Sequence, residues 1–113
     1  MMNDEISPFK ALDFIRDNAV KYAQAKANVI YMTEYRKTMK SILMAEAYDA
    51  KTQSEKETYA YAHPRYVEHL EALKNAVSEC EALRWLMVAA EAKIEVYRTL
   101  EATKRVEMRE STL

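Results

Sequence analysis

The fold of this chain is decided by the stretch Ala60-Tyr61-Ala62-His63-Pro64-Arg65-Tyr66. A residue that precedes proline is pushed out of helical geometry, so a helix that approaches His63 must end there. Proline itself suits the first position of a helix, because its missing amide hydrogen would have no partner there. The stretch therefore predicts a sharp corner, with one helix ending before His63 and another beginning at Pro64.

No helix breaker follows Pro64 before the end of the sequence at Leu113. Apolar residues advance through this part by steps of three and four, which is typical of a coiled-coil seam. We expect one helix from about residue 64 to 110, with an irregular step between Cys80 and Leu83. The expected seam is Tyr66, Leu70, Leu73, Val77, Cys80, Leu83, Met87, Ala90, Ile94 and Tyr97.

Two further helices are expected before the corner. Ser7 can cap free amides and Pro8 suits the first helical position, so a first helix should run from about residue 8 to 48. Thr52 and Glu55 have the spacing of a capping box, which predicts a short helix over 53–61. The expected apolar stripe of the first helix is Leu12, Ile15, Ala19, Tyr22, Val29, Ile30, Met39, Ile42 and Leu43.

The composition agrees with a fold made of helices alone. The 113 residues include no glycine, so tight hairpins and glycine-rich phosphate loops are disfavoured. Ala, Glu, Lys, Leu, Met and Arg are abundant, and these residues lose little side-chain freedom in a helix. We expect an all-α, coiled-coil-like domain over 1–113, in which a long helical hairpin contains a short connecting helix.

The charge balance gives no general attraction to nucleic acid or to an anionic membrane. Lys and Arg number 17 and Asp and Glu number 18, for a formal net charge of −1. The sequence begins with acidic rather than basic residues, and no apolar stretch approaches the roughly 20 residues that a spanning helix needs. We therefore expect a soluble cytoplasmic protein without a membrane partner.

No residue pattern predicts catalysis. His63 and His69 are six positions apart, and neither belongs to a metal-binding motif. Cys80 is the only cysteine, and its neighbours Glu79 and Glu81 would not activate a thiol. The sequence therefore predicts a protein that is not an enzyme and that has no disulfide, metal site or cofactor.

An oligomer is expected from the stretch 83–90, which is apolar around nearly the whole circumference of its helix. A two-helix hairpin covers only one stripe of each helix, so additional neighbours should cover the rest. The expected interface between copies consists of Leu83, Trp85, Leu86, Met87 and Val88. The alternative is that the short helix over 53–61 covers this face within one chain.

Basic charge is concentrated in residues 21–41, where five cations and one glutamate give +4 and leave −5 for the rest. Cations beside aromatic rings that stack on bases are a common basis of single-strand binding. The residues expected to contact single-stranded DNA are Lys26, Tyr31, Tyr35, Arg36, Lys37 and Lys40. The alternative is that these tyrosines pack in a protein interface while the lysines form a solvated surface. A second aromatic cluster surrounds Pro64, and we expect it to pack the corner.

Three stretches together resemble small helical proteins of bacteriophages and prophages that are often encoded beside recombination or single-strand annealing genes. They run from Glu34 to Met44, from Ala60 to Tyr66, and from Leu83 to Arg98. The resemblance implies a role in phage DNA recombination or replication in the host cytoplasm. It favours an oligomeric mediator that holds single-stranded DNA or its coating protein. The alternative is an interaction module that inhibits or recruits a protein without contacting nucleic acid.

Overall fold

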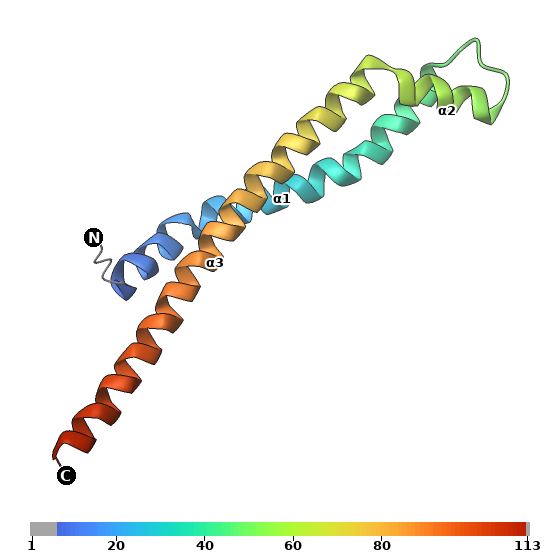
Figure 1. Ribbon diagram of the computed structural model, residues 1–113. Coiled ribbons are helices and arrows are strands. Elements are labelled where there is room, and N and C mark those ends of the chain that lie inside the picture. Colours follow the sequence, from blue (N-terminus) through green and yellow to red (C-terminus); the bar gives the residue numbers. More distant parts are fainter. Residues whose placement is uncertain (1–6, 113) are drawn as a thin grey trace. The chain divides into compact units, whose positions relative to one another are not determined.

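The protein is helical throughout the part that the structure, a computed structural model, describes, which is residues 7–112. Helix α1 is Pro8–Glu46, α2 is Gln53–Ala62 and α3 is Pro64–Thr112 (Figure 1). The described residues contain no strand, so the predicted all-α class and helical hairpin are confirmed. The predicted helix ends at 48, 61 and 110 differ from the observed ends by one or two residues.

Side-chain caps at the predicted positions begin α1 and α2. The amide of Lys10 donates to Ser7 Oγ at 3.3 Å, and the amide of Glu55 donates to Thr52 Oγ1 at 3.1 Å. The Glu55 carboxylate accepts in return from the amide of Lys51 at 2.6 Å, one residue earlier than in an ideal capping box. Both caps satisfy amides that have no carbonyl partner in the first turn of a helix.

The corner at Pro64 has the geometry that a residue before proline requires. His63 is extended, with φ −67° and ψ 136°. Its carbonyl accepts from the amide of Tyr66 at 3.0 Å, and its Nδ1 accepts from the amide of Arg65 at 3.0 Å. His63 therefore ends α2 and caps α3, a role that the sequence pattern did not indicate because histidine is not a common capping residue.

The chain divides into two compact units, which we call the corner unit and the end unit. The corner unit is residues 22–81, and the end unit comprises the described residues before 22 and after 81. Within the corner unit α1 and α3 run antiparallel, and α2 lies where they are connected (Figure 1). Its buried core consists of Met39, Leu43, Ala60 and Tyr66.

The seam of α3 in the corner unit contains the predicted Tyr66, Leu73 and Cys80 but differs from the prediction by one position at the two residues between them. His69 and Ala76 are shielded from solvent, whereas the predicted Leu70 and Val77 are 39% and 41% exposed. His69 can occupy the seam because its Nε2 bonds to the carbonyl of Met32 at 2.7 Å, which satisfies its polar atom. With this correction the steps of three and four are regular along α3, and the predicted irregularity after Cys80 disappears.

The predicted stripe of α1 is also partly wrong. Leu12 and Ile30 are 52% and 58% exposed, while Asn18, Ala25 and Met32 are shielded instead. Asn18 tolerates partial burial because its side-chain amide donates to the carbonyl of Phe14 at 2.9 Å. The observed positions continue a regular heptad, which is the spacing that keeps one face of a helix against its neighbour.

Leu43 is the most deeply buried large side chain among the described residues, with 0% exposure. Leu43→Ala should lower the free energy of unfolding by about 3 kcal/mol, because the core loses apolar contacts and keeps a cavity. Ile42→Ala is the matched control, since Ile42 is 38% exposed and should cost clearly less. Urea unfolding followed by circular dichroism measures both, and equal losses would contradict the assigned core.

Candidate interaction surfaces

The four predicted cations of α1 do not form one free basic patch. Lys26 and Lys37 are exposed, and Lys37 pairs with Glu34 at 3.4 Å. Arg36 and Lys40 are half-buried. The structure therefore leaves Lys26 and Lys37 as the most accessible positive charges of the predicted set.

Lys40 is engaged with the neighbouring helix α2. Its Nζ lies 4.9 Å from the ring centroid of Tyr61 and 3.9 Å from the carboxylate of Glu57. Hydrogen bonding to Tyr61 raises the pKa of Lys40, desolvation opposes this, and the charge of Glu57 adds to the increase. Lys40 thus acts in the corner unit as a link between α1 and α2.

The predicted tyrosines form an aromatic row. The rings of Tyr31 and Tyr35 are stacked, with centroids 5.9 Å apart and an interplanar angle of 17°. The ring of Tyr35 also lies 5.5 Å from that of His69 on α3. Tyr31 is 65% exposed and Tyr35 is half-buried, so Tyr31 is the accessible end of the row.

The tyrosines and the cations lie on different sides of α1. Tyr35 follows Lys26 by nine residues, which is about two and a half turns of an α-helix and places the two on opposite sides. Tyr31 and Lys40 are separated by the same interval. The face shared by the two tyrosines instead contains uncharged polar residues, namely Gln24, Asn28 and Thr38. We call the five residues Gln24, Asn28, Tyr31, Tyr35 and Thr38 the tyrosine face.

The aromatic residues around Pro64 pack largely against one another within the corner. Tyr66 is buried, and its ring meets that of Tyr61 at 5.3 Å in an edge-on arrangement. The ring of Tyr59 meets His63 at 5.6 Å in the same manner. Nearby, Arg65 pairs with Glu46 at 3.1 Å across the hairpin. These contacts hold α1, α2 and the start of α3 together.

The five residues predicted to join copies divide into two groups. Leu83 is buried and Met87 is half-buried within the chain. Trp85, Leu86 and Val88 are 59%, 53% and 39% exposed. The structure therefore leaves this second group on the surface of the end unit. Within the corner unit, α2 packs through Ala60 against Leu43.

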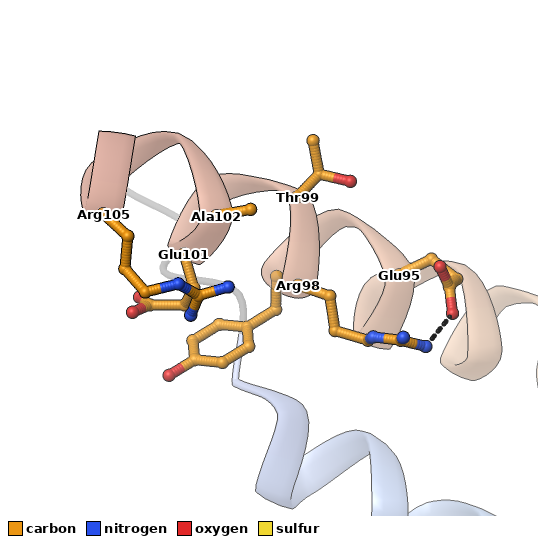
Figure 2. A pocket seen from close by; sticks show the side chains of 7 residues that line it. Glu95, Arg98, Thr99, Glu101, Ala102 and Arg105 are labelled. Carbon is orange, nitrogen blue, oxygen red and sulfur yellow. Dashed lines mark hydrogen bonds and ion pairs between the residues drawn. The ribbon is translucent and has the colours of Figure 1, made fainter. Parts of the chain in front are cut away.

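A shallow depression near the C-terminal end of α3 offers no enclosed site (Figure 2). Its walls come from α3 alone, and Arg98 and Glu95 on its rim pair with each other at 2.8 Å. The labelled side chains in the figure are Glu95, Arg98, Thr99, Glu101, Ala102 and Arg105. A hollow along one helix does not exclude water, as a site for a small molecule normally does.

Within residues 7–112, no group of three or more histidine, cysteine or acidic side chains is gathered to hold a metal ion. Over the same residues, none of the helices is both long and apolar enough to cross a membrane. Comparison with protein-family models, curated proteins and solved structures finds no match for this chain. The resemblance to phage proteins accordingly stays a prediction from the sequence.

The contact of Lys40 with α2 should stabilise the fold at neutral pH, and this contribution should be lost at strongly alkaline pH. A raised pKa in the folded state means that the contribution is complete below the ordinary lysine pKa of about 10.4 and is lost as pH rises through the folded value. Lys40→Met should therefore lower the free energy of unfolding at pH 7 to 9, and by progressively less at higher pH. Urea unfolding of wild type and Lys40→Met, from pH 7 to strongly alkaline pH, measures the difference in the free energy of unfolding.

Lys37→Met is the control for that experiment, because Lys37 is exposed and pairs only with Glu34 of its own helix. It should change the stability little at any pH. A difference between wild type and Lys40→Met that stays constant through strongly alkaline pH would contradict the contribution assigned to Lys40.

Proposed function

We propose that this chain is a non-enzymatic helical interaction module that binds another protein through the tyrosine face of α1. The observation that carries the proposal is the stacked pair Tyr31 and Tyr35, whose accessible end is a 65% exposed ring on a face that has no predicted cation. Tyrosine contributes a large rigid contact area at low entropic cost and is enriched among interface hot spots.

The composition of the tyrosine face favours a protein rather than a nucleic acid as the ligand. A single-strand site needs positive charge beside its stacking rings, to hold the phosphates while the bases stack. Here Lys26 and Lys37 project away from Tyr35, while Asn28 and Thr38 supply neutral donors and acceptors beside the rings. Aromatic rings among small polar side chains are typical of surfaces that recognise proteins.

The row is also held in place before any partner binds. The ring of Tyr35 packs against His69, and His69 is fixed by its bond to the carbonyl of Met32. Tyr31 stacks on the side chain thus positioned. A preorganised surface loses less conformational entropy on binding, which favours affinity. The resemblance to small phage proteins that are often encoded beside recombination genes makes a recombination or single-strand-binding protein the first partner to test.

Tyr31→Ala tests the proposal without disturbing the contact between Tyr35 and His69. The immobilised wild-type chain should retain a protein from an extract of its own cells, and Tyr31→Ala should weaken that binding by roughly thirtyfold, as expected for a hot spot. Ile30→Ala is the matched control, because Ile30 is 58% exposed and lies outside the tyrosine face, about 100° around the helix from Tyr31. Retention that Tyr31→Ala leaves unchanged would overturn the proposal.

Single-stranded DNA binding is the second candidate, and it is favoured by the basic charge of residues 21–41 and the exposure of Lys26 and Lys37. Binding by such lysines should weaken steeply with salt, because each phosphate contact releases counterions. A fluorescence anisotropy titration at low and moderate salt measures this. The double variant Lys26→Glu with Lys37→Glu should then lose binding while retaining the protein partner.

The titration separates the two candidates. If wild type fails to bind single-stranded DNA at low salt, the second candidate is removed and the protein-binding proposal is unaffected. If Tyr31→Ala loses DNA and protein to the same extent, the division of the two faces of α1 is wrong.

A further inference from the structure

The outward face of α3 in the end unit carries a second heptad. Its positions advance by alternating steps of three and four from Ala82 to Val106. We call this set the outer seam, and all of its members are exposed. They are Ala82, Trp85, Ala89, Ala92, Val96, Thr99, Thr103 and Val106.

The outer-seam side chains are exposed in the described residues, and Trp85 contacts the guanidinium of its neighbour Arg84, which lies 4.6 Å from the ring centroid. The shielded apolar positions of α3 in the end unit, which we call the inner seam, are Leu83, Met87, Ala90, Ile94 and Tyr97. From Trp85 to Thr99 each outer-seam residue lies two positions from an inner-seam residue, as Trp85 does from Met87, and two positions correspond to about 200° of rotation. The two seams therefore face opposite directions.

The outer seam contains no charged residue. Eight charged residues occur between positions 82 and 106, and none of them occupies any of its eight positions. A helix that is covered on one side normally carries its charges on the side opposite. Here the opposite side is uncharged and includes Trp85 at 59% exposure, together with Val96 and Val106 at 45% and 47%. Such a face is expected to be covered.

The occupant should be another helix. A strict alternation of three and four is the repeat that keeps one face of a helix against a supercoiled neighbour over many turns. The seam continues for about 36 Å along α3, since a helix rises about 1.5 Å per residue. A globular protein or a small ligand would not require that repeat.

We propose that a second copy of this chain packs antiparallel along the outer seam, with the twofold axis passing between Ala92 and Val96. In this register each large residue meets a small one. Trp85 lies opposite Thr103 of the second copy, and Val106 lies opposite its Ala82. Val96 lies opposite Ala92 of the second copy. A twofold interface has to be complementary to itself in this way.

The residues beside the seam agree with the same register. Leu86 and Leu100, which are 53% and 49% exposed, come together from opposite copies on one side. Val88 meets Ala102 on the other side. Glu95 lies near the axis, where its charge is already balanced by Arg98 at 2.8 Å on its own helix. The two exposed Lys93 side chains near the axis remain solvated at the rim, where their repulsion costs a few tenths of a kcal/mol.

The area is sufficient for a dimer. The exposed parts of the outer seam and of its four apolar neighbours amount to on the order of 800 Å² per copy, which is what one side of a stable interface buries. The inference concerns α3 of the end unit and does not depend on the tyrosine face of α1. Failure of either proposal therefore leaves the other in place.

Light scattering of the full chain tests the assembly. At about 100 times the dissociation constant the mass should be twice 13.2 kDa. Ala92→Glu places a charge beside the axis of both copies and should yield the monomer mass with unchanged helical circular dichroism. Ala72→Glu is the matched control, an exposed alanine on another side of α3, and it should remain dimeric. A monomeric wild type, or a dimeric Ala92→Glu, would overturn the proposal.

Trp85 provides a second readout, because it is the only tryptophan. Its emission should move to shorter wavelength as the wild-type concentration rises, since dimerisation removes the indole from water. Ala92→Glu should show no such shift. An emission that is independent of concentration in a chain of dimer mass would place the contact elsewhere and contradict the outer seam.

Disulfide formation tests the orientation in a Cys80→Ser background. A mixture of Ala92→Cys and Val96→Cys copies should form a mixed disulfide, because these positions are opposite each other in the antiparallel register. Neither variant should cross-link efficiently alone. Cross-linking of Ala92→Cys with itself, without the mixed product, would show a parallel pair and overturn the proposed register.

Discussion

Pro64 carries no amide hydrogen and forces the residue before it into extended geometry, and the corner unit depends on this constraint. Helix α2 cannot continue through it, so the chain changes direction at His63. The carbonyl and Nδ1 of His63 then satisfy the first amides of α3. The turn brings Ala60 and Tyr66, which are close in sequence, against Leu43 on α1. The buried core of this unit is therefore a consequence of the corner.

The helices and their beginnings could be predicted because they depend on neighbours in the sequence. The caps at Ser7 and Thr52 act within three residues, and the effect of Pro64 is immediate. The seam could not be predicted as well. Leu70 is more apolar than His69, yet His69 faces inward because α1 presents a carbonyl to its ring nitrogen. That partner is 37 positions away, and no local pattern identifies it.

The candidate surfaces show the same division between local and distant information. The cations and tyrosines of residues 21–41 are close together in the sequence, but the rotation of the helix places Lys26 and Tyr35 on opposite sides. That separation follows from helical geometry and was available in the sequence. The contact of Lys40 with Tyr61 was not, because it depends on how α2 folds back onto α1. The uncharged outer seam can also be recognised in the sequence when the positions of the inner seam are known.

The last turns of α3 lie beyond the inner seam, so their stability as a helix needs another source. From Ala102 to Thr112 each residue is exposed, so packing within the described chain contributes little there. Local pairs such as Lys104 with Glu101 at 3.4 Å are exposed and contribute only a few tenths of a kcal/mol each. Helices in water owe most of their stability to the packing of one face. Because the outer seam extends through Thr103 and Val106, the second copy would supply that packing, and the order of this segment would be coupled to assembly.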